Sequence, residues 1–147
     1  MLYFCVFTHE TFYFQKEQRK VFFSAKGFGA GRTVNNGVVI FNQNFIEANE
    51  GEGFDKTTGR FRAPLAGAYE FGFSGSTSYL YSPTQVRVFK NDSPQYYFFN
   101  SNEGRIWNDF STSWIYKLSA GEEVYLKVAT GNLHFVQFSG KLLKADD

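Results

Sequence analysis

Aromatic residues at a spacing of two are the feature that most constrains the fold of this chain. Tyr69, Phe71 and Phe73 alternate with small or polar residues. Because side chains two positions apart lie on the same face of a β-strand, this alternation predicts a strand over residues 69–74 with one aromatic face. Pro64 lacks the backbone donor that a strand interior needs, so it predicts the end of a preceding strand over residues 60–63.

Turn-forming residues separate this strand from other short runs rich in β-branched and aromatic residues. The pair Asn36-Gly37 favours a tight turn because both residues tolerate positive φ, and Gly59 and the pair at 91–92 mark further turns. The expected strands cover residues 21–25, 38–42, 60–63, 69–74, 85–90, 95–100, 110–118 and 134–143, with a loop over 74–83. No helical period with caps interrupts them. Short strands broken by turns predict a β-sandwich or barrel.

The composition fits a single globular domain. The chain has 147 residues, of which 20% are aromatic and 19 are Phe, and this supplies ample material for a core. Its 15 basic residues are scattered and its net charge is +1, which argues against nucleic acid as a partner. A single Cys cannot form an intramolecular disulfide, so the stability of the fold must come from packing.

Residues 1–20 are not assigned to the domain that we expect over residues 21–147. The apolar run at 1–7 is too short to span a bilayer, and it lacks the basic start and the cleavage site of a signal peptide. Tyr13 and Phe14 are compatible with an added edge strand. The sequence predicts no membrane span and leaves open whether this segment is a truncated leader.

Three motifs occur in order along residues 21–143. The central one consists mainly of small and aromatic residues: Asn49, Gly51, Gly53, Phe54, Asp55, Thr58, Gly59, Phe61, Pro64, Gly67, Tyr69 and Phe71. The others are Ala-Gly-Glu-Glu-Val-Tyr-Leu at 120–126 and Phe-Ser-Gly-Lys-Leu-Leu at 138–143. Together they resemble the globular head domain of complement component 1q, which often has Pro at the position of Lys56 and has Asp at that of Glu122. The resemblance implies an all-β, ten-strand jelly-roll β-sandwich of two antiparallel sheets, shared with tumour necrosis factor-like ligands.

The same resemblance implies a homotrimer, because heads of this family associate around a three-fold axis. Strand 113–118 is apolar on both faces, whereas a two-layer sandwich covers only one face of each sheet. The interface candidates are Phe23, Trp114 and Tyr116. The residues expected to build the core are Phe61, Gly67, Tyr69, Phe71, Phe138 and Gly140, with the glycines where a side chain would clash. The alternative is a monomer in which residues 1–20 cover the second face.

Four residues in expected loops are candidates for ligand binding, namely Tyr79, Tyr81, Arg105 and Trp107. Exposed aromatic rings stack on the apolar faces of sugars, and Arg presents a fork of hydrogen-bond donors. The group therefore suits a carbohydrate or a protein ligand. The alternative is that Trp107 packs beneath its own loop as a satellite of the core.

Catalysis and a bound cofactor are not expected. His9 and His134 are the two imidazoles, too few for the metal site of a jelly-roll enzyme, and Cys5 lies in the least domain-like part of the chain. The densest carboxylate group lies at positions 47, 50, 52 and 55. A calcium site there would need six or more converging oxygens. We therefore prefer a solvated turn, although members of the similar family sometimes bind calcium through loop carboxylates.

The function that the resemblance implies is a secreted, trimeric recognition domain of an innate-immune or lectin-like kind that detects patterns on its ligand. A cytokine-like trimeric ligand of the tumour necrosis factor type would have the same fold, and a carbohydrate-active jelly-roll enzyme ranks third. Paired carboxylates about 5–9.5 Å apart in a cleft would favour the enzyme. A groove between subunits that engages a receptor would favour the cytokine.

Overall fold

All regular secondary structure in the described part of the chain is β. The computed structural model describes residues 3–8, 11–16, 19–28, 34–35, 37–41, 46–78, 84–100, 107–131 and 133–147. The strands are β1 (Tyr3–Thr8), β2 (Thr11–Lys16), β3 (Phe22–Phe28), β4 (Val34–Asn35), β5 (Val38–Val39), β6 (Ile46–Glu50), β7 (Phe54–Asp55), β8 (Arg60–Arg62), β9 (Gly67–Ser78), β10 (Thr84–Lys90), β11 (Ser93–Asn100), β12 (Trp107–Leu118), β13 (Glu123–Thr130) and β14 (Phe135–Ala145).

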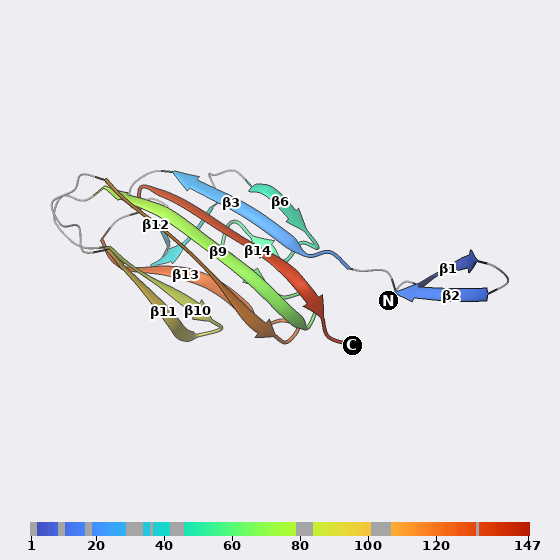
Figure 1. The fold of residues 1–147 in the computed structure, drawn as a ribbon. Coiled ribbons are helices and arrows are strands. Elements are labelled where there is room, and N and C mark those ends of the chain that lie inside the picture. The colour runs from blue at the N-terminus through green and yellow to red at the C-terminus, as the bar shows by residue number, and fades with distance from the viewer. Residues whose placement is uncertain are drawn as a thin grey trace.

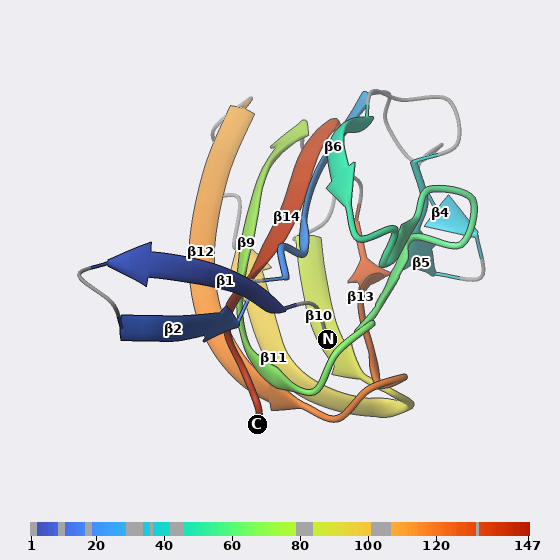
Figure 2. The ribbon, with the colours of Figure 1, turned by 90° about the vertical axis from the view of Figure 1, so that its right-hand side faces the viewer.

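Two antiparallel sheets face each other and form a sandwich (Figures 1 and 2). The five-stranded sheet has the order β12-β9-β14-β3-β6, and the seven-stranded sheet has the order β11-β10-β13-β5-β4 with β8 on β13 and β7 on β8. The prediction of an all-β sandwich of two antiparallel sheets is therefore confirmed. The strands exceed the expected ten because two-residue pieces and the hairpin β1-β2 are counted among them.

The hairpin of β1 and β2 forms a two-stranded sheet of its own. Figure 1 shows it beyond the start of β3, apart from the sandwich. Tyr13 and Phe14 do lie in a strand, as the sequence suggested, but this strand pairs with β1 and not with an edge of the sandwich.

The aromatic face of β9 lies at the centre of the core. Tyr69 and Phe71 are fully buried, as are Phe61 from β8 and Phe138 from β14. The Phe23 ring stacks on that of Phe54 at 4.5 Å between centroids, and on that of Phe61 at 5.1 Å. Because β3 belongs to one sheet while β7 and β8 belong to the other, these stacks join the two layers. Aromatic pairs of this kind contribute about 0.5–1.5 kcal/mol beyond the area that they bury.

Two glycines allow close packing at this core. A Cβ atom on Gly140 would lie 2.5 Å from Phe23 Cε1 and 2.9 Å from Phe71 Cδ1. A Cβ atom on Gly67 would overlap the backbone carbonyl of Lys144 on the neighbouring strand β14. The expectation that a side chain would clash at Gly67 and Gly140 agrees with these distances.

Strand β9 is longer than the sequence predicted. Residues 74–78 continue the strand where a loop was expected, and β12 begins at Trp107. The two strands pair without a break from Gly67 and Leu118 at one end to Ser78 and Trp107 at the other. The backbone of this polar segment therefore completes its hydrogen bonds in the sheet although its side chains carry little strand signal.

Candidate functional site

Three of the four expected ligand-binding residues belong to two connections at the same end of the sandwich, and the fourth, Trp107, is the first residue of β12 and not part of a loop. Residues 79–83 lead from β9 to β10, and residues 101–106 lead from β11 to β12. Ser78 pairs with Trp107 and Thr84 pairs with Asn100, so the flanks of the two connections are side by side. Tyr79, Tyr81 and Arg105 lie outside the described residues. Of Trp107 the backbone pairing alone is described, and binding by these four residues therefore stays a prediction.

A shallow hollow of about 480 Å³ opens beside this end of the five-stranded sheet. Asp109, Ser76 and Phe135 form one row across β12, β9 and β14. The full lining consists of Ser74, Gly75, Ser76, Asp109, Phe110, Ser111 and Phe135. Hydroxyl groups and a carboxylate beside an aromatic ring are groups that position a polar ligand such as a saccharide. This hollow was not expected from the sequence, because residues 74–78 carry little strand signal and the lining is joined only by the pairing of β9 with β12 and β14.

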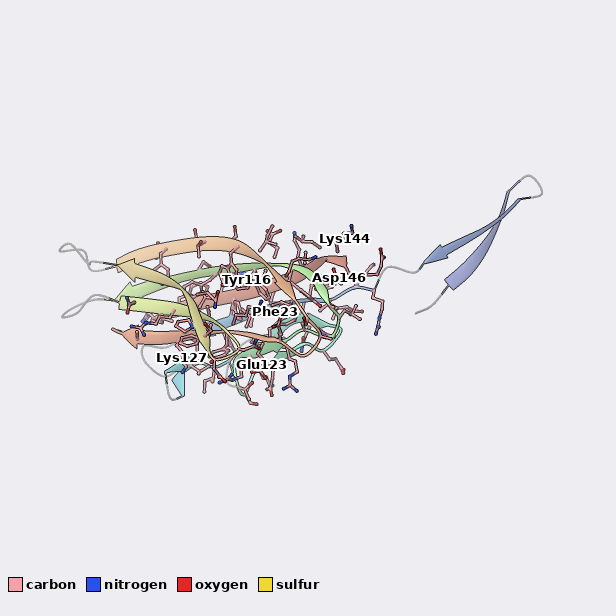
Figure 3. All side chains as sticks on the ribbon, turned by 90° about the horizontal axis from the view of Figure 1, so that it is seen from below. Phe23, Tyr116, Glu123, Lys127, Lys144 and Asp146 are labelled. Carbon is pink, nitrogen blue, oxygen red and sulfur yellow. The ribbon has the colours of Figure 1, made fainter. Side chains whose placement is uncertain are left out.

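A second hollow, of about 750 Å³, lies at the opposite end, where β3 begins and β14 ends. Phe22 and Leu143, which are 40% and 46% exposed, contribute apolar surface, and Lys20, Lys141 and Lys144 contribute charge. Figure 3 shows Lys144 and Asp146 at this end, toward the hairpin. Leu143 lies at an irregularity in the register of β14 against β9, between Leu142 and Lys144, and no local sequence pattern indicates this irregularity.

The residues expected at a subunit interface point inward. Phe23 and Trp114 are 2% and 7% exposed and belong to the core, and Tyr116 is half-buried against it. Figure 3 labels Phe23 and Tyr116 within the body of the sandwich. These side chains are thus largely covered within one chain, because the aromatic faces of β3 and β12 turn toward the seven-stranded sheet. Among the described side chains of β12, Ile115 is the exposed large apolar one, at 59%.

The outward face of the five-stranded sheet carries little net charge. Its central row runs across four strands as Ser24, Ser139, Gly72 and Ser113. The row on one side is Lys26, Gln137, Ser74 and Ser111, and the row on the other is Phe22, Lys141, Glu70 and Ile115. The Lys26 ammonium lies 2.6 Å from Glu47, and that of Lys141 lies 3.7 Å from Glu70, so the charges of these rows are paired.

The acidic segment around residue 50 is a turn and not a three-carboxylate cluster. Asp55 Oδ1 accepts hydrogen bonds from the Thr57 backbone at 2.9 Å and from its hydroxyl at 2.7 Å. These bonds, the hydroxyl bond foremost, lower the pKa of Asp55 because they favour the charged carboxylate. Glu47 is held by Lys26. No three His, Cys, Asp or Glu residues within the described ranges come close enough together to hold a metal ion.

Among the described residues, Cys5 and His134 do not form a pair. His134 is exposed and its backbone NH donates to the Ser76 carbonyl at 2.9 Å. Cys5 lies in β1, where its backbone pairs with Phe14. His9 lies outside the described residues.

A second turn is held by the carboxylate of Glu122. Its oxygens accept from the Ser119 backbone NH at 2.9 Å and from the Asn91 amide at 3.4 Å, and Lys90 lies 3.6 Å away. The bond from Ser119 is the main reason that the pKa of Glu122 is lowered. Asn91 Oδ1 in turn accepts from the Glu123 NH at 2.9 Å. The turn between β10 and β11 is therefore fixed to the turn between β12 and β13.

No helix that could cross a membrane occurs among the residues that the structure describes.

Comparison with known proteins identifies the family of the fold. The family model for the C1q domain matches residues 8–143. Complement C1q tumor necrosis factor-related protein 3 of Mus musculus is 32% identical over 113 residues, which cover 74% of this chain and 45% of that protein. The human protein of the same name matches equally. The chain therefore spans less than half the length of these relatives.

Solved structures give the same result for the fold. The globular domain of zebrafish complement 1qA protein superposes with a TM-score of 0.72 at 21% identity, covering 86% of this chain and 99% of that one. Eiger TNF from S. frugiperda superposes with a TM-score of 0.64 at 11% identity, covering 86% and 96% of the two chains. The motifs around Gly67 and Gly140, the two-sheet sandwich and the match over residues 8–143 agree with one another, and the chain belongs to the C1q domain family.

Proposed function

We propose that the chain is a non-enzymatic recognition domain that acts outside the cell as a homotrimer. The observation that carries the proposal is the outward face of the five-stranded sheet. Its central row of Ser24, Ser139, Gly72 and Ser113 allows close approach of a second surface, and its charged side chains already have partners. Ile115 adds an apolar side chain that is 59% exposed. Association there would bury Ile115 and leave few charges to desolvate.

A ring of three copies satisfies this geometry. The outward face of the five-stranded sheet carries Phe22 and Ile115 on one side and polar side chains on the other. Two copies of this face therefore do not match each other. A head-to-tail arrangement joins such a face to a different surface of the next copy and closes when the rotation permits. The argument for a homotrimer therefore does not depend on Phe23 and Trp114, which are buried in the core.

Ligand binding is assigned to the end of the sandwich that carries the connections at 79–83 and 101–106. The hollow with Asp109, Ser76 and Phe135 lies beside the strand ends from which these connections leave. Ser74 and Ser111 of its lining belong to a marginal row of the outward face, so the hollow lies beside the proposed subunit interface. It combines hydrogen-bonding groups with one aromatic ring, which suits a polar ligand. We therefore favour a carbohydrate ligand over a peptide at this end.

An array of unsulfated glycans with the purified chain tests this function. We expect binding to a restricted set of glycans, weakened by Asp109→Ala and unchanged by Asp92→Ala, a matched control in the exposed turn between β10 and β11. Binding to no glycan, or equal binding by Asp109→Ala, would remove the saccharide assignment. Reproducible turnover of a glycan, abolished by one substitution, would contradict the non-enzymatic role.

A further inference from the structure

Two cations face each other directly on the outward side of the seven-stranded sheet. Arg87 on β10 is the register partner of Lys127 on β13, and both side chains are half-buried. Like charges directly opposite in an antiparallel pair are destabilising, whereas neutral or opposite pairs are not. This arrangement therefore opposes stability at the centre of a sheet and calls for another explanation.

Further basic residues extend the pair. Arg60 and Arg62 lie on β8, which pairs with β13 through Arg62 and Glu123. The Arg60 Nη1 atom lies 2.9 Å from a Glu123 oxygen and the Arg62 Nη2 atom lies 3.4 Å from the other. One carboxylate thus serves two guanidinium groups. We call Arg60, Arg62, Arg87 and Lys127 the outer cation patch.

Aromatic rings hold two cations of this region, Arg60 and Lys127, in place. The Tyr125 and Phe89 rings stack at 5.3 Å between centroids. The Arg60 guanidinium lies 3.9 Å above the Tyr125 ring, and the Lys127 ammonium lies 4.7 Å from the centroid of Phe89. A cation–π contact fixes the position of a charge but does not neutralise it. This applies to Lys127, whereas Arg60 is also paired with the carboxylate of Glu123. Ordered cations lose less side-chain entropy when they bind an anion.

The carboxylates near the outer cation patch offset its charge only in part. Asp55 faces Arg60 across β7 and β8, and its carboxylate accepts hydrogen bonds from Thr57 while it keeps its negative charge. Burial is the main cause that raises the pKa of the Tyr125 hydroxyl, and Asp92, in the exposed turn between β10 and β11, raises it further by its charge. With Glu123, three carboxylates therefore oppose four cations, and the patch keeps a net positive charge. Among the described side chains Lys127 forms no ion pair with a carboxylate.

We propose that the outer cation patch binds a sulfated polysaccharide. Repeated sulfate groups on one chain would meet Arg87, Lys127 and the two arginines of β8 together, and linkage raises the effective concentration of each group after the first. A nucleic acid fits less well, because Tyr125 is 1% exposed and offers no open face for a base to stack on. An extended peptide also fits less well, since β10 and β13 are interior strands with no free edge. The proposal names a ligand class for the recognition function proposed above and rests on it.

Binding to dextran sulfate, with neutral dextran as the uncharged control, tests the proposal in the full chain. We expect wild type to bind dextran sulfate alone, with an affinity that falls as salt rises. The double variant Arg87→Gln/Lys127→Gln should bind roughly tenfold more weakly, a change of about 1.4 kcal/mol. Its plot of log affinity against log salt should be shallower by about two. The matched double variant Arg19→Gln/Lys20→Gln, exposed ahead of β3 and outside both proposed surfaces, should bind like wild type.

A thermal melt separates loss of the site from loss of the fold. Removing two opposed cations should leave the melting temperature of Arg87→Gln/Lys127→Gln unchanged or raised. No binding of dextran sulfate by wild type would overturn the proposal, as would equal binding by this variant. Equal binding of oligothymidylate of the same charge would also overturn it, by showing attraction to any polyanion. The trimer and the saccharide hollow are measured by mass and by the Asp109 variant, so their failure is distinguishable from this one.

Discussion

The side-chain amide of Asn49 pairs with the backbone of Phe54 as a neighbouring strand would. Its Nδ2 donates to the Phe54 carbonyl at 2.8 Å, and its Oδ1 accepts from the Phe54 NH at 3.1 Å. The chain between them turns sharply, with φ of 80° at Gly51 and 55° at Glu52. Asn49 thereby satisfies both polar groups of a residue whose ring is buried in the core.

Replacement of Asn49 by Ala should destabilise the protein measurably. Two part-buried backbone groups would lose their partners, and each such loss costs about 1–3 kcal/mol. Chemical unfolding should therefore show a lower free energy of unfolding for Asn49→Ala. Gln95→Ala is the control, because Gln95 is exposed and bonds within its own turn. Equal stability of the two variants would show that the amide of Asn49 does not organise this turn.

Truncation of Phe71 should be among the most damaging core changes. Its ring lies within 5.8 Å of the Trp114 ring and 5.5 Å of the Phe61 ring, between centroids. Phe71→Ala should cost about 3–5 kcal/mol, the usual penalty for emptying an aromatic core site. A thermal melt displaced by about one or two degrees would be too small for this assignment.

A single added methyl group should distinguish two glycines on neighbouring strands. Gly140→Ala forces a Cβ atom against two buried rings, and overpacking of this kind costs about 1–3 kcal/mol. Gly72→Ala meets the Ser139 hydroxyl at 3.1 Å, and this small side chain can rotate away. We expect a clearly lower melting temperature for Gly140→Ala alone, and equal melting temperatures would contradict the packing at Phe23 and Phe71.

Stability should decrease in mild acid because of Asp55 and Glu122. Their pKa values in the folded protein lie below the ordinary values of 3.8 and 4.5. A lowered carboxyl pKa contributes stability that is complete above the ordinary value and is lost as pH falls through the folded value. Melting temperature should thus fall below about pH 4.5, and less steeply in the double variant Asp55→Asn/Glu122→Gln. If the melting temperatures of wild type and of the double variant fall equally with decreasing pH, other groups control the loss of stability in acid.

Local sequence patterns predicted the positions of strands better than they predicted the pairing and burial of those strands. The alternation at Tyr69, Phe71 and Phe73 gave the strand and its buried face correctly, because strand period depends on neighbouring residues alone. The end of β9 at Ser78 was missed because pairing with β12, not its own side chains, stabilises that segment. Strand 113–118 looked apolar on both faces, and only the sandwich shows that Trp114 points in and Ile115 points out.

The candidate sites are formed by the pairing register of strands that are distant in the sequence. No local sequence pattern predicts this register. No local pattern singles out Arg87 or Lys127, and the scattered basic residues argued against nucleic acid as a partner. Pairing of β10 with β13 brings the two side chains to opposite positions. Asp109 and Phe135 are likewise joined only through Ser76 of β9.

The mass of the chain in solution, from light scattering at micromolar concentration, tests the central claim most directly. We predict three times the 16.8 kDa of one chain for wild type and for Ala129→Arg, an exposed position on the other sheet. Ser113→Arg, exposed at the centre of the outward face, should shift the mass to that of one folded chain. A wild-type mass near one chain, unchanged when residues 1–20 are deleted, would contradict the homotrimer, and so would a trimer that tolerates Ser113→Arg.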